Sequence, residues 1–162
     1  MKIRNVSNTD ISDIIAIYNY YIENTCITFE EEPVTSNEML KRIETISKVH
    51  PFIVAELDNK VIGYAYATSW RVRSAYRFSS EITIYLDHKM KGKGVGSQLF
   101  SALIEKLKET DLHVLVGGIA LPNEASIALH EKYGFEKVAQ FSEIGYKFNQ
   151  WIDVGYWELK LK

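Results

Sequence analysis

The segment Ser80–Ser97 constrains the fold most, because a β-rich run leads directly into closely spaced glycines and then into a helical pattern. Polar and aliphatic residues alternate up to Leu86, so Glu81 is predicted on the strand face opposite to the aliphatic side chains. Apolar residues then recur at helical spacing from Val95 to Leu107. The chain is therefore expected to form a strand, a tight turn and an amphipathic helix, in that order.

Glycines occupy alternate positions of this turn, at Gly92, Gly94 and Gly96. Glycine lets the backbone bend close to a ligand, and the N–H groups at the start of a helix favour anions. The pattern predicts a cofactor that carries phosphate groups, with its pyrophosphate held by Gly92–Ser97. A flexible turn without a ligand fits the same glycines, because the run has neither the GxGxxG of a dinucleotide fold nor the spacing of a Walker loop.

Composition narrows the classes of protein. The chain has 162 residues, of which 46% are hydrophobic and 25% charged, and this fits one globular domain over residues 1–162. A net charge of -2 and a pI near 6.1 predict no partnership with nucleic acid or with an anionic membrane. No apolar stretch reaches the ~20 residues of a membrane-spanning helix, and the first residues lack the apolar region of a signal peptide, so a cytoplasmic location is expected.

Cysteine and histidine usage argues against disulfide and metal chemistry. Cys26 is the only cysteine, so an internal disulfide is excluded, and we interpret it as a packing residue. His50, His88 and His113 have no metal-ligand spacing among themselves or with carboxylates. We therefore predict that the protein binds no metal.

Period and turn signals predict an α+β fold with a mixed, largely antiparallel sheet of about seven strands flanked by helices. Thr35 and Glu38 form a capping-box pattern, Asp58-Asn59 is typical of a hairpin turn, and Asn123 opens a short helix that ends near Gly134. The predicted strands are residues 1–6, 52–57, 61–69, 80–86, 113–119, 136–142 and 154–161.

The order of strand, glycine turn, helix, strand and Asn123-led helix resembles the GNAT superfamily of acyl-CoA-dependent N-acetyltransferases. Within it, the chain looks most like the phosphinothricin acetyltransferase group, over nearly its whole length. The segments that carry the resemblance are Phe29 with Glu32-Pro33, Trp70 to Tyr85, Leu121-Pro122-Asn123, Ser126 with Leu129-His130-Glu131, and Gly145-Tyr146-Lys147 with Trp151 and Asp153. The resemblance implies a GNAT-type sheet whose central parallel pair splays apart.

The resemblance implies that Glu81 is the general base and that His130 supplies or relays a proton to the leaving thiolate. A carboxylate accepts the proton of an attacking amine, and an imidazole with a pKa of about 6.5 suits proton delivery. The alternatives are a surface carboxylate on a strand and a histidine satisfied by hydrogen bonds on a half-buried helix. A tyrosine is common at this position in the superfamily. The phosphinothricin-like group has a histidine there, as this chain has His130.

Acetyl-CoA is the cosubstrate that the resemblance implies. A backbone N–H of the strand would stabilise the oxyanion of the tetrahedral intermediate. The implied cofactor-binding residues are Ile84, Tyr85, Leu86, Lys91, Gly92, Lys93, Gly94, Val95, Gly96, Ser97, Asn123 and Ser126. Lys91 departs from the usual Arg or Gln and lacks the forked guanidinium group. Asn123 is equally suited to act only as a helix N-cap.

Three of the five arginines, Arg71, Arg73 and Arg77, lie in one short stretch before Glu81. Such clustering in a slightly acidic chain favours an anionic acceptor, although solvated loop charges have the same pattern. The resemblance places Phe29, Arg71, Arg73 and Tyr76 at acceptor-binding positions, and Arg73 is the first choice for the anion. The implied acceptor is a small acidic amino-acid-like amine of the phosphinothricin, methionine sulfone or methionine sulfoximine type.

Two other functions fit the same residues. One is acetylation of a protein N-terminus or lysine, which needs an open groove, and the other is a non-catalytic regulator that binds acyl-CoA. The resemblance also implies a homodimer, with residues 145–153 near the acceptor site of either subunit.

Overall fold

The computed structural model describes residues 1–162 and contains seven strands that hydrogen-bond in the order β1-β2-β3-β4-β5-β7-β6. Strands β4 and β5 pair in parallel. Four other pairs are antiparallel: β1 with β2, β2 with β3, β5 with β7, and β6 with β7. The strands are β1 (Lys2–Asn5), β2 (Phe52–Leu57), β3 (Lys60–Ser69), β4 (Ser79–Leu86), β5 (Val114–Ala120), β6 (Glu136–Lys147) and β7 (Gln150–Lys160). The helices are α1 (Ile11–Asn24), α2 (Ser36–Ser47), α3 (Val95–Lys108) and α4 (Glu124–Lys132). The predicted fold class is confirmed.

The chain divides into two compact units that interleave along the sequence. Unit 1 contains Met1–Asn19, Val34–Thr68 and Ile82–Asp111, and unit 2 contains Tyr20–Pro33, Ser69–Glu81 and Leu112–Lys162. The single-domain organisation stays a prediction. No helix has both the length and the apolar character that crossing a membrane requires.

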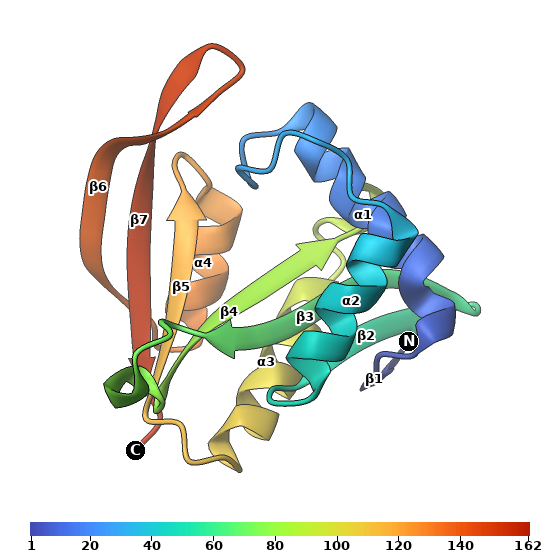
Figure 1. Ribbon diagram of the computed structural model, residues 1–162, viewed down its shortest axis with the longest axis horizontal. Helices are drawn as coiled ribbons and strands as arrows, with labels where there is room; N and C mark the ends of the chain where they lie inside the picture. Colours follow the sequence, from blue (N-terminus) through green and yellow to red (C-terminus); the bar gives the residue numbers. More distant parts are fainter. The chain divides into compact units, whose positions relative to one another are not determined.

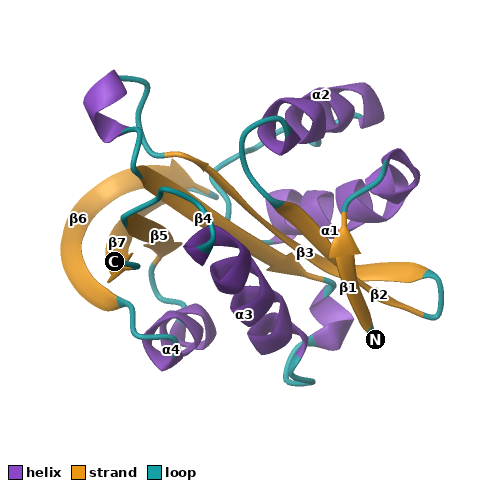
Figure 2. Cartoon of the chain, turned by 90° about the horizontal axis from the view of Figure 1, so that it is seen from below, coloured by secondary structure: helices purple, strands orange, loops and turns teal.

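In unit 1, helices cover both faces of the first strands. Figure 2 shows α2 and the start of α1 on one side of β2 and β3, with α3 on the other. Ile53 and Val54 point to opposite faces of β2, and both are fully buried, as is Leu99 of α3. A strand covered on both faces needs apolar residues at consecutive positions, which explains the run at the start of β2.

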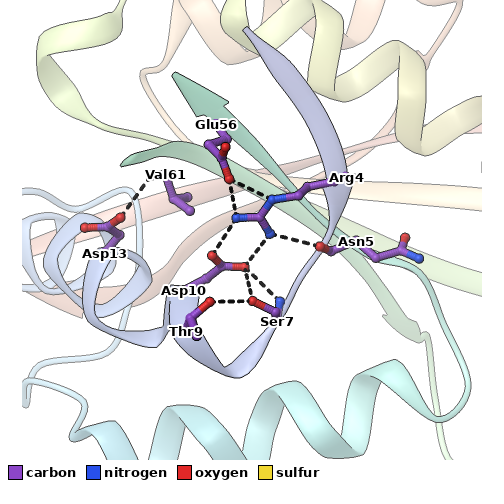
Figure 3. A network of polar contacts seen from close by, with 8 residues as sticks. All are labelled: Arg4, Asn5, Ser7, Thr9, Asp10, Asp13, Glu56 and Val61. Atoms are coloured by element: carbon purple, nitrogen blue, oxygen red, sulfur yellow. Dashed lines mark hydrogen bonds and ion pairs between the residues drawn. The ribbon is translucent and has the colours of Figure 1, made fainter. Parts of the chain in front are cut away.

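A network centred on Arg4 ties β1 to the start of α1 and to β2 (Figure 3). Its guanidinium donates two hydrogen bonds of 2.8 Å to the buried Asp10 carboxylate and a third of 2.8 Å to Glu56. Asp10 also accepts the backbone N–H of Ser7 at 2.8 Å. Burial raises the pKa of Asp10, but the hydrogen bonds from Arg4 and Ser7 and the charge of Arg4 together lower it below its usual value.

Local turn and cap signals are confirmed. Thr35 caps α2 by accepting the N–H of Glu38 at 3.2 Å. Asp58 and Asn59 have positive φ angles of 51° and 61°, as a tight hairpin turn between β2 and β3 requires.

In unit 2, a short parallel ladder joins β4 to β5. It pairs Ser79–Glu81 with Val114–Val116 and goes no further, so Glu81 is its last residue on β4. Figure 1 shows α4 lying beside β5, with β7 and β6 following on the other side. The ladder therefore fixes the backbone of Glu81.

The predicted end of the sheet is wrong in one respect. The predicted strands 136–142 and 154–161 are both too short, because β6 extends to Lys147 and β7 starts at Gln150. The turn is Phe148-Asn149, with positive φ angles of 51° and 59°. Phenylalanine is not a typical residue at positive φ, so the sequence lacks the Asn-Gly signal of such a turn.

Candidate active site

Glu81 lies where the parallel ladder ends, and its side chain is half-buried. Burial raises the pKa of its carboxyl group, and the positive charge of Arg71 opposes this effect. No hydrogen bond or salt bridge to another residue engages the carboxylate. A half-buried carboxylate with a raised pKa and no structural partner has the properties of a general base.

Gly118 and Tyr156 flank this carboxylate. A Cβ atom on Gly118 would lie 3.3 Å from Glu81 Oε1 and 3.1 Å from Tyr156 Cε1. Gly118 belongs to β5, an inner strand, yet it is exposed to solvent. We call Glu81, Gly118 and Tyr156 the Gly118 cluster. Because Gly118 has no side chain, its backbone between the carboxylate and the phenol ring is exposed to solvent.

Tyr156 is electrostatically coupled to Glu81. Burial raises the pKa of the Tyr156 hydroxyl, the charge of Glu81 raises it further, and Arg71 opposes both. Neither Tyr156 nor Gly118 was predicted from the sequence. The pair Gly117-Gly118 within an apolar strand was the available signal, since an internal glycine often marks a close approach of a ligand or of another chain segment.

The three arginines before Glu81 differ in their surroundings. Arg71 stacks over the ring of Trp70, 4.1 Å from its centroid, and its charge acts on Glu81. Arg77 stacks over Phe78 at 4.4 Å and donates to the Ser74 carbonyl at 3.1 Å. Arg73 is exposed and precedes a short 3-10 helix. Arg71, rather than the first choice Arg73, is the arginine that is coupled to the carboxylate.

The other two predicted acceptor residues are both 41% exposed. Phe29 packs on Gly145 of β6. A Cβ atom built on Gly145 would overlap the Phe29 ring. Tyr76 ends the 3-10 helix of the arginine segment and donates its N–H to the carbonyl of Arg73 at 3.0 Å. Gly145 therefore fixes one side of the Phe29 ring.

His130 is buried in unit 2, with 4% of its surface exposed. Its Nδ1 atom lies 2.7 Å from the Ser126 carbonyl oxygen, so the proton on Nδ1 is donated to that oxygen. Burial lowers the pKa of the imidazole, and the hydrogen bond to Ser126 opposes this effect. The net shift makes the neutral ring the main form at pH 7.

Asn123 caps α4. Its Oδ1 atom accepts the N–H of Ser126 at 3.2 Å, and Glu124 follows as the first helical residue. The cap accounts for this oxygen, whereas the amide nitrogen makes no hydrogen bond within the chain. A cofactor contact of Asn123 would use that nitrogen.

The glycine turn lies in unit 1 and leads into α3, as predicted. Gly92 and Gly94 have positive φ angles of 76° and 79°, and no atom lies within 4 Å of a Cβ built on either. Lys91 and Lys93 are exposed beside them. The first N–H groups of a helix have no intrahelical acceptor. An exposed helix start with flanking lysines and space at each glycine fits a pyrophosphate group.

The remaining predicted cofactor residues belong to the second half of β4, also in unit 1. Ile84, Tyr85 and Leu86 are half-buried, and the Tyr85 ring packs edge-on against Tyr18 at 5.1 Å. No group of three or more histidine, cysteine, aspartate or glutamate side chains is arranged to hold a metal ion.

Comparisons with known proteins find the chain similar to N-acetyltransferases. Residues 3–155 match the model of the acetyltransferase (GNAT) domain family. The chain is 34% identical to phosphinothricin N-acetyltransferase of Streptomyces viridochromogenes, over 98% of this chain and 86% of that protein. It is 36% identical to L-methionine sulfoximine/L-methionine sulfone acetyltransferase of Pseudomonas aeruginosa, over 99% and 94%. A solved phosphinothricin acetyltransferase of Sinorhizobium meliloti in complex with acetyl-CoA has a TM-score of 0.95 and 34% identity, covering 98% and 87%.

Proposed function

This chain belongs to the GNAT family of acetyltransferases, and we propose that it transfers the acetyl group of acetyl-CoA to the amino group of a small acidic amino-acid-like acceptor. The observation that carries the proposal is the Glu81 carboxylate, which has a raised pKa, no structural partner and an exposed glycine beside it. The family match includes residues of both units, which supports the prediction of one N-acetyltransferase domain.

In the proposed reaction, Glu81 removes a proton from the acceptor ammonium group, directly or through one water. The amine nitrogen then bonds to the thioester carbonyl carbon, the carbon–sulfur bond breaks, and the electron pair leaves on the CoA sulfur. A raised pKa brings the carboxylate closer to the pKa of the amine, which makes the proton transfer less unfavourable. Catalysis requires Glu81 in its ionised form.

The negative charge on the carbonyl oxygen needs a donor already in position. We propose a backbone N–H within Ile84–Leu86, because the parallel ladder ends at Glu81 and leaves this part of β4 unpaired to β5. Lys91 to Ser97 and the α3 N-terminus would hold the pyrophosphate. Backbone donors are fixed before the reaction starts, so they need little reorganisation.

The CoA thiolate takes up a proton as it leaves, and the proposed sources are His130 and solvent. The lowered pKa leaves little imidazolium at pH 7, and the Nδ1 proton is donated to Ser126. These features favour two roles for His130: relaying a proton to the thiolate, or positioning neighbouring groups. They do not favour direct proton donation from a charged ring. Asn123 and Ser126 stay proposed cofactor contacts, held by the same helix.

For the acceptor, we propose that Arg71 binds the carboxylate. Its guanidinium is held over Trp70 and its charge acts on Glu81. Arg73, Tyr76 and Phe29 stay proposed as further acceptor contacts. The names of the relatives from Streptomyces and Pseudomonas support phosphinothricin, methionine sulfone and methionine sulfoximine as the acceptors to test first.

The deciding experiment measures CoA release with acetyl-CoA and a panel of amines that includes these three compounds, ordinary amino acids, polyamines and peptides. Saturable turnover of the amino-acid analogues by wild type supports the proposed acceptor class. Loss of this turnover in Glu81→Gln, with acetyl-CoA binding kept, supports Glu81 as the base. Turnover of peptides or polyamines alone contradicts the proposed class of acceptor. Acetyl-CoA binding with no turnover of any amine favours a regulator.

We also propose that the protein is a homodimer through the β6–β7 hairpin. The hairpin patch consists of Ile144, Tyr146, Phe148 and Trp151, each more than half exposed. Tyr146 and Trp151 are cross-strand partners with ring centroids 4.7 Å apart. β6 ends the strand order, so the patch and a strand edge lie together. A large exposed apolar patch at a sheet edge is typical of an interface, and a second copy supplies a matching patch.

A further inference from the structure

We propose that Lys147 is a positioning residue for the acceptor site, because it holds the segment Cys26–Phe29 against the end of the β6–β7 hairpin. We call Cys26–Phe29 the Phe29 segment; it and the hairpin both belong to unit 2. The proposal rests on the proposed function, in which Phe29 is an acceptor contact. Lys147 is buried, so it acts through the segment and does not touch the acceptor.

The Phe29 segment covers one face of β6. Gly145 and Lys147 are buried, whereas Tyr146 between them is more than half exposed. Alternate residues of a strand point to the same face, so Gly145 and Lys147 share the covered face. The Phe29 ring packs on Gly145, and the Thr28 carbonyl accepts a hydrogen bond of 2.9 Å from Lys147 Nζ. Two successive residues of the segment therefore dock on alternate residues of the strand.

A third contact joins the Phe29 segment to β7. Gln150 is the cross-strand partner of Lys147, and its Nε2 atom donates to Cys26 Sγ at 3.3 Å. A sulfur atom is a weak acceptor, whereas a hydrogen bond from an ammonium group is charge-assisted and stronger. Of the polar contacts between segment and hairpin, the one made by Lys147 is therefore expected to contribute most.

The surroundings of Lys147 favour a positioning role over a purely stabilising one. Lys147 is 2% exposed and Thr28 is 7% exposed. The Thr28 carbonyl accepts from the ammonium group, the Phe148 ring centroid is 5.1 Å from Nζ, and no carboxylate lies within ion-pair distance. Burial of a charge without an ionic partner costs free energy, and an apolar side chain would fill this site without that cost. The specific contribution of lysine is a fixed place for the Thr28 carbonyl.

The Thr28 carbonyl determines how Phe29 is presented. The carbonyl group of Thr28 and the backbone nitrogen of Phe29 belong to the same planar peptide unit, so a hydrogen bond to that oxygen orients the Phe29 backbone directly. Gly145 fixes one side of the ring, and 41% of Phe29 stays exposed. Without Lys147, an acceptor would have to order the segment as it binds, and this cost weakens binding.

The test measures the KM of the best acceptor of the amine panel and the KM of acetyl-CoA in wild type and Lys147→Met, which keeps an unbranched side chain and removes the donor. We expect the acceptor KM to rise about tenfold, the effect of losing one charge-assisted hydrogen bond, with an unchanged acetyl-CoA KM. Lys147→Gln is too short to reach the carbonyl and should behave alike. Lys160→Met is the matched control, because Lys160 is exposed on β7 and should change neither constant.

Gly145→Ala perturbs the same segment independently. Its methyl group overlaps the Phe29 ring, so the acceptor KM should rise and the acetyl-CoA KM should stay. The double variant Lys147→Met/Gly145→Ala should raise the acceptor KM less than the product of the two single effects, because both act through one segment.

Hydrogen exchange followed by mass spectrometry tests the docking without any turnover. Exchange in residues 26–30 should be faster in Lys147→Met and Lys147→Gln than in wild type, and unchanged in Lys160→Met. Unchanged exchange and acceptor KM in the Lys147 variants overturn the proposal, as does an equal rise of both KM values, which indicates a general loss of structure. The proposed function survives both results. If wild type turns over no amine, the proposed function fails and the acceptor role of Lys147 with it, whatever the exchange shows.

Discussion

The imidazole of His130 lies directly against the backbone of Gly117, where a Cβ atom would be 2.4 Å from Nε2 and 2.6 Å from Cδ2. The adjacent glycine, Gly118, faces Glu81 and Tyr156 instead. Successive residues of a strand point to opposite faces, so the two glycines serve different sides of β5. One accommodates a buried ring and the other a half-buried carboxylate.

Gly117→Ala should therefore destabilise the protein more than Gly118→Ala does. The added methyl group overlaps a ring that is 4% exposed, and overpacking of this kind costs about 1–3 kcal/mol. Beside Gly118, the nearest atoms would lie 3.1 and 3.3 Å from the added Cβ, so a shift of a few tenths of an ångström relieves the contact. Urea unfolding of both variants measures the difference. Equal free energies of unfolding would show that the His130 ring moves freely, contrary to its burial.

The pH profile of kcat/KM should report the ionisation of Glu81. Because burial raises the pKa of the carboxyl group, the acidic limb of the profile is expected above the ordinary value of 4.5. Glu81→Gln should lose about 100- to 10,000-fold in kcat/KM together with this limb. Steady-state rates at constant ionic strength measure both. If Glu81→Gln retains the acidic limb of the kcat/KM profile, that limb reports the ionisation of another group.

Asp10→Asn should cost about 1.5–3 kcal/mol at pH 7, because it removes one of the two carboxylates that accept hydrogen bonds from the Arg4 guanidinium in a partly buried network. The pKa of Asp10 is lower in the folded state, so its contribution is present above the ordinary value of 3.8 and is lost as the pH falls below that value. The difference in unfolding free energy between wild type and variant should shrink over that range. A difference independent of pH would contradict the assignment.

Gly94→Ala should raise the KM for acetyl-CoA without changing the KM for the acceptor. Its φ angle of 79° strains any residue with a Cβ, by about 1–2 kcal/mol, and the strain is relieved by moving the turn. Gly134→Ala is a matched control, because Gly134 has a φ angle of 87° after α4 and is not in the turn. Both variants should lose similar stability, and only Gly94→Ala should weaken acetyl-CoA. If the two variants have the same KM for acetyl-CoA, the glycine turn does not bind the cofactor.

Trp151→Lys should convert the proposed dimer into a monomer, since it places a charge in the hairpin patch, where Trp151 is 63% exposed. Val49→Lys is the control, because Val49 is 71% exposed and lies in unit 1, outside the hairpin. Light scattering coupled to gel filtration gives the mass of each. A monomeric wild type rejects the dimer, and a dimeric Trp151→Lys moves the interface away from the hairpin patch.

Local signals were sufficient for most of the fold. The N-cap at Thr35, the Asp58-Asn59 turn and the glycine turn before Val95 each act over a few residues, and each is confirmed, although only the Thr35 half of the predicted capping box is found. The hairpin turn at Phe148-Asn149 was missed because its left-handed residues are not those that favour this conformation. A turn of this kind is imposed by the pairing of the flanking strands.

The candidate site was predicted in part. Glu81 and the glycine turn were indicated by strand alternation and by spacing, whereas Gly118 and Tyr156 were not. Their proximity depends on the register of β5 with β7, which brings residues 38 positions apart in the sequence into a pair. Periodicity identifies which residues share a face of one strand, but it carries no information on the register between strands.

The division into two units assigns the proposed acceptor residues and the proposed pyrophosphate site to different units. Glu81, which is proposed as the base, and the arginine segment belong to unit 2, whereas the glycine turn and the second half of β4 belong to unit 1. Three boundaries between the units fall inside elements, because residues 19 and 20 both lie in α1, residues 68 and 69 in β3, and residues 81 and 82 in β4. A chimeric enzyme that takes its proposed acceptor residues from a relative must therefore have its junctions in the connecting turns, so that each helix and strand comes whole from one parent.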